Sequence, residues 1–221
     1  MERLEQLRRA NPHIAIHSVH EPLFARYGRV IEEDTAPWRA AAEAAVDFPE
    51  TGSQYQAVLP ELDELPQAEM VRQRYCGHLD EQFGLCWGHA NRLNALEWHT
   101  CSEFNIAVRE LVLLLAKRSD ITEGRLDANK VAAFYLEQGA MVEVYADSLH
   151  FCPCQVTSSG FSCVVGLQRG TNLPLDPEKA VSPMLWAKNK WLIAHRDNAP
   201  LVARGAYPGI FGENWQIFPI D

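Results

Sequence analysis

LNALEWHTCSEFNIAVRELVLLL, residues 93–115, is the stretch that decides the fold. It holds three short apolar or alternating segments separated by polar or turn-forming residues, and three more follow further along the chain. The six segments are Leu93–Glu97, Glu103–Val108, Leu111–Leu115, Ala132–Leu136, Met141–Tyr145 and Phe161–Gln168. Strand-like segments at this spacing, with Gly, Asp and Asn between them, are typical of an antiparallel sandwich or barrel.

Helical patterns dominate the two ends of the chain. Thr35 at a capping position with Pro37 in the first turn predicts a helix through Val46. Other helices are expected over residues 1–10, 61–74 with an interruption near Pro66, and 182–190; short strands are expected over residues 14–19, 29–31 and 55–59. We therefore predict a mostly β single domain over residues 1–221, in which a barrel core of about 84–180 carries α-helical extensions at 1–83 and 181–221.

Composition narrows the classes of partner. Of 221 residues, 47% are hydrophobic and 22% are charged, which is ordinary for a globular protein. Twenty basic residues against 29 acidic ones give a net charge of −9, so a nucleic-acid backbone would be repelled. We find neither a run of about 18 apolar residues for a membrane span nor a signal-peptide pattern, and we expect a cytoplasmic protein. The six cysteines have irregular spacing, which favours reduced, mostly buried thiols.

Several metal-capable side chains share one strand face. Glu97 and His99 have the same parity, as do Glu103 and Asn105, and side chains alternate along a strand with period two. A second segment, residues 139–150, predicts a strand and a turn that lead to His150. Imidazole and carboxylate together suit a divalent ion such as Mn, Fe or Zn. The alternative is a plain polar face, since a lone His or Glu in a strand is usually solvated or hydrogen-bonded.

The spacing Glu97-x-His99-x-x-x-Glu103 resembles the first motif of cupins, with Glu in place of the leading His. Residues 145–150, YADSLH, resemble the second motif without its Pro and Gly. The resemblance implies a cupin fold, which is a double-stranded β-helix or jelly-roll barrel. It also implies that the metal is held by Glu97, His99, Glu103 and His150.

A more specific resemblance runs from about residue 20 to the end of the chain. The motifs are Tyr27-Gly28-Arg29-Val30, the run from Asn94 to Asn105, Leu149-His150 with Pro153-Cys154, Gly160-Phe161, Gly170-Thr171-Asn172, and the run from Asn189 to His195. Together they resemble one bacterial cupin family that was long catalogued only as a domain of unknown function. That family includes the sulfoquinovose isomerases of the transaldolase branch of sulfoglycolysis.

The resemblance implies a metal-dependent aldose–ketose isomerase that moves a proton between C1 and C2 through an enediol. Such chemistry needs a Lewis acid and a positioned base. Mn is the first choice of metal, and Zn, Fe, Co or Ni would also suit these ligands. Glu143, on the strand that leads to His150, is the first candidate base, and Tyr145 is a candidate proton donor. Alternatively, Glu97 or Glu103 is the base and only three groups bind the metal.

A sulfonated sugar also requires cations or hydrogen-bond donors at the far end of the pocket. The candidate substrate-binding residues are Arg29, His89, Arg92, Asn105, Thr171, Asn172, Lys190 and His195. The expected partner is thus a sulfonated or other small sugar, with no nucleic acid and no membrane. An exposed sheet edge and long extensions favour a homo-oligomer, a dimer or higher.

Four other functions fit the same residues. They are isomerisation of another aldose or a uronic acid, oxidation of a substrate by bound iron and oxygen, sugar binding without turnover, and a metal-free lyase reaction that would survive chelation. Two carboxylates among the four ligands favour an ion that binds sugar hydroxyls.

Overall fold

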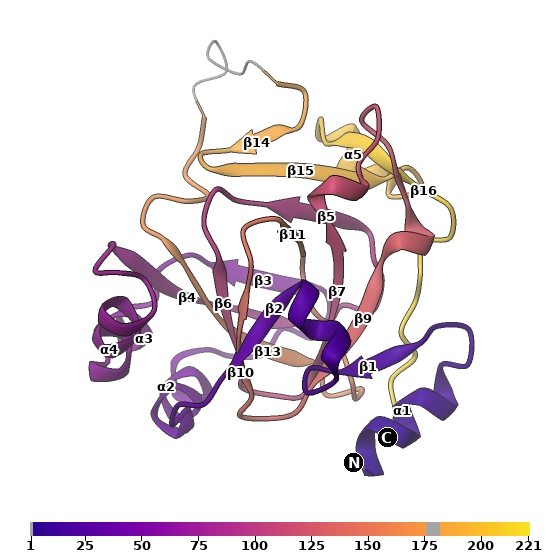
Figure 1. Ribbon diagram of the computed structural model, residues 1–221. Helices are drawn as coiled ribbons and strands as arrows, with labels where there is room; N and C mark the ends of the chain where they lie inside the picture. Colours follow the sequence, from indigo (N-terminus) through magenta and orange to yellow (C-terminus); the bar gives the residue numbers. More distant parts are fainter. Residues whose placement is uncertain (1, 176–181) are drawn as a thin grey trace.

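The computed structural model describes residues 2–175 and 182–221 (Figure 1). The protein is mostly β, as the spacing of the apolar segments predicted, and the described strands form three sheets. The largest is an antiparallel six-stranded sheet. Its order is β2 (Gly28–Ile31), β10 (Met141–Val144), β6 (Glu103–Ala107), β13 (Phe161–Gln168), β4 (Glu81–Gly88) and β3 (Ser53–Gln56).

The second sheet faces the first across the barrel interior. Its strands are β1 (Ile16–Ser18), β9 (Ala132–Leu136), β7 (Leu111–Lys117) and β11 (Ser148–Leu149), with β12 (Cys154–Gln155) also paired to β7. The apolar run in β7 is a strand buried on both faces. Leu113 and Leu115 pack with residues of the six-stranded sheet, whereas Val112 and Leu114 pack on the opposite side. This alternation follows from the period of two along a strand.

The third sheet closes the end of the barrel where the site lies. Its strands are β14 (Leu185–Ala187), β15 (Lys190–His195), β16 (Tyr207–Phe211) and β8 (Leu126–Asp127), with β5 (Ala95–Trp98) paired to β15. The prediction of a helix over residues 182–190 is wrong, because β14 and β15 form a hairpin there. Asn189 turns the chain with a φ of 56°, a left-handed conformation that ends regular structure and that Asn tolerates better than most residues.

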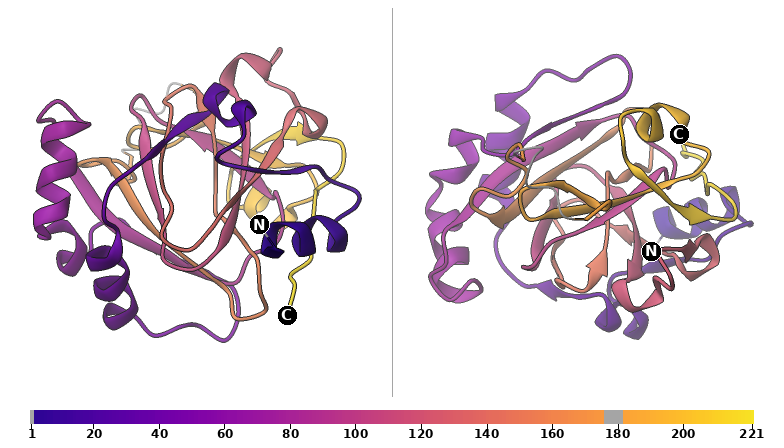
Figure 2. Two further views of the ribbon diagram at one scale, coloured as in Figure 1. Left: turned by 60° about the horizontal axis from the view of Figure 1, so that its bottom comes forward. Right: turned by 90° about the horizontal axis from the view of Figure 1, so that it is seen from above.

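The helices at Ala36–Ala45, Pro60–Asp63 and Pro66–Arg74 cover the outer face of the six-stranded sheet (Figure 2). The described helices are α1 (Glu2–Ala10), α2 (Ala36–Ala45), α3 (Pro60–Asp63), α4 (Pro66–Arg74) and α5 (Ala199–Ala203), and the 3₁₀ turns are Pro22–Arg26, Arg118–Asp120 and Ala128–Lys130. The predictions of α1, of α2, and of a helix pair interrupted near Pro66 are confirmed. Trp38 of α2 is buried against Phe83 of β4, with ring centroids 4.8 Å apart.

The segment before residue 84 is more than a helical covering, because β1, β2 and β3 hydrogen-bond into the two large sheets. The strand predicted over residues 55–59 is shifted toward the N-terminus and forms β3 at Ser53–Gln56. Within the described ranges, no helix combines the length and the apolar character that crossing a membrane would require.

The C-terminal segment passes beside the C-terminal end of α1 (Figure 1). Asn11, which is fully buried, links them. Its Nδ2 donates to the carbonyls of Leu7 and Phe218, both at 2.9 Å, and its Oδ1 accepts from the Phe218 amide at 2.7 Å. One side chain thereby holds the C-terminal segment against the end of α1.

We predict that Asn11→Ala lowers the free energy of unfolding by about 1–3 kcal/mol, because it leaves buried backbone groups without partners. Urea denaturation monitored by circular dichroism measures this. The matched control is Asn129→Ala, since Asn129 is exposed and should change stability little. Equal stability of the two variants would contradict the role of Asn11.

Candidate metal centre

The structure brings together the four side chains that the sequence nominated as ligands. One ligand atom from each of Glu97, His99, Glu103 and His150 lies within 4.8 Å of the others, and all four residues are buried. Glu97 is in β5, His99 follows it, Glu103 begins β6, and His150 follows β11. A backbone bridge joins two of these segments: the Glu97 amide donates to the His150 carbonyl at 2.7 Å, and the reverse bond is 3.0 Å.

Period-two alternation in this region is confirmed. Glu97 lines the pocket, whereas its neighbour Trp98 is buried away from it and stacks on Trp191 with an interplanar angle of 11°. Glu103 and Asn105 likewise line the pocket. Phe104, between them, packs on the helix-covered face of the sheet.

Backbone carbonyls orient both imidazole rings. His99 Nδ1 donates to the Asn189 carbonyl at 2.7 Å, and His150 Nδ1 donates to the Ser148 carbonyl at 3.1 Å. Because a carbonyl only accepts, each Nδ1 carries a proton, and Nε2 is the atom left to bind a cation. This is the usual support for a metal-bound histidine.

The donor set fits a divalent cation. Nε2 of His99 is buried without a hydrogen-bond partner, and Nε2 of His150 has only the Glu103 carboxylate, 3.0 Å away. A buried nitrogen without a partner is costly unless another group completes it. Nε2 of His99 lies 3.7 Å from Glu97 Oε1 and 3.6 Å from Glu103 Oε2, so the unsatisfied atoms converge on one point. Imidazole nitrogen with carboxylate oxygen suits Mn, Fe or Zn.

Without a metal, Glu103 and His150 form a buried ion pair, with Oε2 and Nε2 3.0 Å apart. Burial alone would raise the pKa of the Glu103 carboxyl, but the neighbouring imidazoles, His150 above all, hold that pKa well below its usual range. Burial would lower the pKa of His150, but Glu103 raises it to about 9. A cation that binds Nε2 of His150 must therefore displace a proton.

A second layer of side chains holds the ligands in place. Asn105 Nδ2 donates to Glu103 Oε1 at 2.8 Å. Asn189 Nδ2 donates to Thr171 Oγ1 at 2.9 Å, which fixes the residue whose carbonyl holds His99. Thr171, predicted to bind substrate, thus lies behind the site and supports it.

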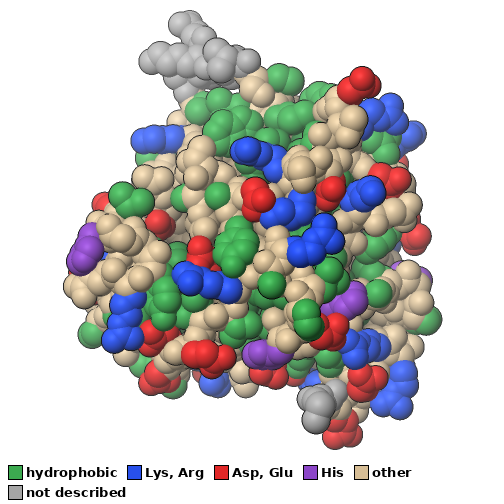
Figure 3. All heavy atoms as spheres, viewed as in Figure 1, with side chains coloured by type: hydrophobic (Ala, Val, Ile, Leu, Met, Phe, Trp, Pro, Cys, Tyr) green, Lys and Arg blue, Asp and Glu red, His purple; other side chains and the backbone are tan. Residues whose placement is uncertain are grey.

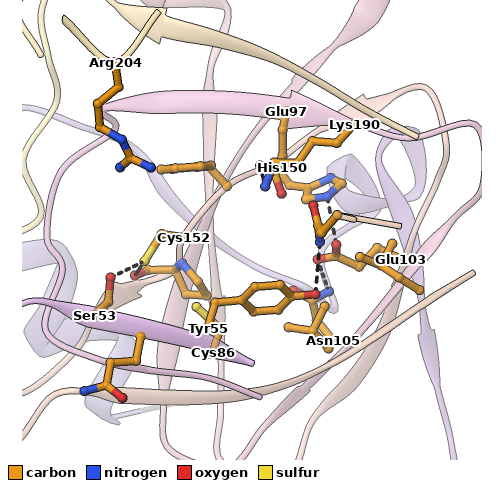
Figure 4. Close-up of a pocket in the computed structure, with 16 residues that line it drawn as sticks. Ser53, Tyr55, Cys86, Glu97, Glu103, Asn105, His150, Cys152, Lys190 and Arg204 are labelled. Atoms are coloured by element: carbon orange, nitrogen blue, oxygen red, sulfur yellow. Dashed lines mark hydrogen bonds and ion pairs between the residues drawn. The ribbon is translucent and has the colours of Figure 1, made fainter. Parts of the chain in front are cut away.

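A pocket of about 460 Å³ opens onto the ligands (Figure 4). It lies between the inner face of the six-stranded sheet and the β5–β15 side of the barrel. Among the predicted substrate-binding residues, Asn105, Asn172 and Lys190 line it. The Lys190 ammonium forms an ion pair with Glu97 Oε2, which leaves Oε1 directed toward His99.

Four other predicted substrate-binding residues are not among the described residues that line this pocket. Three have partners elsewhere: Arg92 with Gln216 Oε1 at 2.6 Å, His195 Nε2 with the Gly212 carbonyl at 3.2 Å, and the His89 ring with Phe48. The fourth, Arg29, forms an ion pair with Glu143 at 2.7 Å. These contacts place the four side chains in packing or surface pairs away from the pocket.

Glu143 and Tyr145 are likewise not among the described pocket-lining residues. Val142 and Val144 of β10 face the barrel interior, so the alternation directs Glu143 to the opposite side of the sheet, toward Arg29. Tyr145 has the same parity. The prediction that Glu143 is the base followed its proximity in sequence to His150, and strand alternation removes the geometric support for it.

Two pocket residues that the sequence did not single out are Tyr55 and Arg204. The Tyr55 hydroxyl points toward Glu103 and Asn105 (Figure 4) and accepts a hydrogen bond from Asn172 Nδ2 at 3.1 Å. Although 41% of Tyr55 is exposed, its hydroxyl end is enclosed, and burial beside Glu103 raises its pKa well above the usual range. Arg204 lies across the pocket from the ligands (Figure 4). Neither residue belongs to a recognisable motif.

Fold and site together define a mostly β protein with a buried His/Glu cluster suited to a divalent cation. The chain belongs to the family described as Domain of unknown function (DUF4867), which matches residues 16–215. The match spans all the motifs that carry the sequence resemblance. No curated protein is detectably similar in sequence.

Solved structures of Bacillus subtilis oxalate decarboxylase resemble part of the chain. One, from work on the Mn(II) centres of that enzyme, has 11% sequence identity and a TM-score of 0.32, and covers 44% of this chain and 24% of that one. Another, at pH 4.6, has 9% identity and a TM-score of 0.31, and covers 44% and 23%. The chain therefore spans about a quarter of the length of those proteins. A likeness this weak says nothing of what this chain does.

We predict that Glu103→Gln and His150→Ala each weaken Mn²⁺ binding by about 100-fold or more, because each removes a ligand. Asn105→Ala should weaken Mn²⁺ binding by about tenfold, because Glu103 loses the hydrogen bond from Asn105. Isothermal titration calorimetry of the purified protein measures these affinities.

Glu143→Gln is the matched control, since it changes a carboxylate near β10 that does not line the pocket. It should bind Mn²⁺ like the unaltered protein. Unchanged affinity in Glu103→Gln and His150→Ala would show that the cluster is only a buried ion pair.

Proposed function

We propose that the protein is a metal-dependent aldose–ketose isomerase with a cupin-type barrel, and that it converts sulfoquinovose to 6-deoxy-6-sulfofructose. The observation that carries the proposal is the buried cluster of two imidazoles and two carboxylates at one side of a pocket that has the Arg204 guanidinium at its other side. The family resemblance supplies the particular sugar.

The ligands and the pocket suit a sugar with adjacent oxygens. Four protein ligands or fewer leave coordination positions open for a substrate. A divalent ion bound there would polarise the carbonyl and hydroxyl oxygens of the sugar and stabilise negative charge on them. Tyr55, whose hydroxyl remains protonated because its pKa is raised, can donate a hydrogen bond to a sugar oxygen. Asn172 orients that hydroxyl.

Glu97 is the best-placed base. Glu103 is held by His150 and Asn105, whereas Glu97 lines the pocket and its principal polar side-chain partner is Lys190. Its carboxylate would take the proton from C2 of the aldose to give the enediol and, after that proton exchanges with solvent, deliver a proton to C1. Lys190 pairs with Glu97 Oε2 and can donate a hydrogen bond to a sugar oxygen. The metal would then be held by His99, Glu103 and His150.

Arg204 is the candidate partner for the sulfonate. Its guanidinium lies opposite the ligands, and it is 5.7 Å from the centre of the Trp186 ring, which favours one orientation of the side chain. A planar guanidinium can bind a sulfonate oxygen pair with two parallel hydrogen bonds. A carboxylate would be bound in the same way, so a uronic acid is the second candidate substrate.

We also propose that the protein works as a cytoplasmic homo-oligomer in which residues 1–221 form one domain. The face in Figure 3 supports the expectation of no nucleic-acid partner, because Lys and Arg side chains alternate there with Asp and Glu and form no continuous basic area. The net charge of −9 also disfavours binding of a nucleic acid, because it repels the phosphate backbone.

Proton NMR of the purified protein with sulfoquinovose in heavy water tests the reaction. We expect 6-deoxy-6-sulfofructose to appear with deuterium at the exchanging carbon, and both signals to be lost when a chelator removes the metal. Glu97→Gln should still bind Mn²⁺, but the rate of deuterium incorporation should fall by about 10²-fold or more, because the base is gone.

Each other outcome has a distinct meaning. No change with sulfoquinovose, but conversion of another aldose or a uronic acid, would keep the isomerase and replace the substrate. Binding without turnover would indicate a non-catalytic sugar-binding barrel, and turnover that survives chelation would indicate metal-free chemistry. Loss of metal in Glu97→Gln would make Glu97 a fourth ligand.

We predict that Arg204→Ala raises the KM for sulfoquinovose by about 10–100-fold, since a hydrogen-bonded charge pair contributes about 1.5–3 kcal/mol. The value of kcat should change much less, because Arg204 lies away from the reacting carbons. Arg196→Ala is the matched control, since Arg196 is exposed and is not among the pocket-lining residues. An equal effect of both substitutions would exclude Arg204 as the sulfonate partner.

A further inference from the structure

Two thiols meet in the wall of the pocket, apart from the metal cluster. Cys86 lies in β4, and Cys152 lies in the loop that follows His150. Both residues line the pocket, and their side chains are neighbours in its wall. Figure 4 shows both sulfur atoms at the same side of the pocket, near Ser53 and Tyr55. Residues far apart in sequence thus form a close dithiol.

The β3–β4 pair holds Cys152 in this position. The Cys152 thiol donates to Ser53 Oγ at 3.4 Å. Ser53 and Tyr55 lie in β3, and Tyr55 is the register partner of Cys86. Period-two alternation places Ser53, Tyr55 and Cys86 on the pocket face of the sheet, so the loop that carries Cys152 rests against that face.

The other cysteines are placed differently. Cys163 is the register partner of Cys86 on β13, but it is fully buried and its thiol is directed to Asn105 Oδ1 at 3.8 Å. Cys154 is buried in the core on the far side of β7. Cys76 and Cys101 are partly exposed, and neither is among the residues that line the pocket. All six cysteines are free thiols in the structure.

We propose that Cys86 and Cys152 are a modification site that reacts with low-molecular-weight disulfides, of which oxidised glutathione is an example, to form an intramolecular disulfide. Cys152 is the attacking thiol because it is partly exposed, whereas Cys86 is 8% exposed. Its sulfur attacks one sulfur of the small disulfide, which forms a mixed disulfide and releases one small thiol. Cys86 then attacks the Cys152 sulfur and releases the second small thiol.

The exchange balances without another reactant. Two protein thiols lose two protons and two electrons, and the small disulfide is reduced to two thiols by the same protons and electrons. The new bond joins β4 to the segment that carries His150, within the wall of the pocket. The inference uses only the placement of the thiols and does not depend on the proposed isomerase activity.

Mass spectrometry of the reduced full-length protein after incubation with oxidised glutathione tests the site. We expect the intact mass to fall by two hydrogen atoms with no retained glutathione, and non-reducing peptide maps to join the Cys86 and Cys152 peptides. Cys86→Ala should accumulate a stable glutathione adduct on Cys152, since the resolving thiol is absent. Cys152→Ala should form neither the adduct nor the cross-link.

Cys76→Ser is the matched control, because it removes a partly exposed thiol outside the pocket, and it should form the Cys86–Cys152 disulfide as readily as the unaltered protein. Three results would overturn the proposal: no reaction, a stable adduct on Cys152 in the unaltered protein, or a cross-link to Cys101 or Cys163. Circular dichroism checks that each variant is folded. If a variant is unfolded, the peptide map of the unaltered protein alone shows whether Cys86 and Cys152 are cross-linked.

Discussion

The backbone bridge between Glu97 and His150 is the constraint on which the site depends. Its two hydrogen bonds, at 2.7 and 3.0 Å, join the third sheet to the end of β11 and bring ligands from separate segments to one point. The bridge leaves two carboxylates and two imidazoles buried together. Buried charges are costly unless they are paired or bind a metal. Here Lys190 and the Glu103–His150 pair compensate part of that charge, and the unpartnered Nε2 of His99 lies where a cation could bind.

The hairpin of β14 and β15 supplies most of the second layer. Asn189, at its turn, holds His99 through its carbonyl and binds both the Thr100 amide and the Thr100 hydroxyl through Oδ1, at 3.0 and 2.6 Å. Lys190, the next residue, reaches Glu97. The left-handed conformation of Asn189 therefore serves both the turn and the site. The C-terminal part of the chain, which looks from its sequence like a covering over the barrel, completes the candidate metal centre.

The pocket has candidate metal ligands at one side and a cation at the other. The ligands and Glu97 lie at one side, and Arg204 lies across from them (Figure 4). A substrate with adjacent oxygens at one end and an anion at the other would satisfy both sides. The Cys86–Cys152 dithiol occupies a third part of the wall, where the loop after His150 meets β4. Oxidation there would act on the segment that positions a ligand.

The sequence by itself determined the strands that alternate and the residues on their pocket face. Period two decides that Glu97, Glu103 and Asn105 face inward and that Trp98 does not, because it is a local property of the extended backbone. The same rule, applied with the register of β10, would have directed Glu143 outward. Only the tertiary structure decided which distant segments meet: Tyr55, Arg204 and the Asn189 turn reach the site through strand pairing and loop docking. Those contacts depend on how sheets stack and on which turn a few residues adopt, and no local pattern in the chain encodes either one.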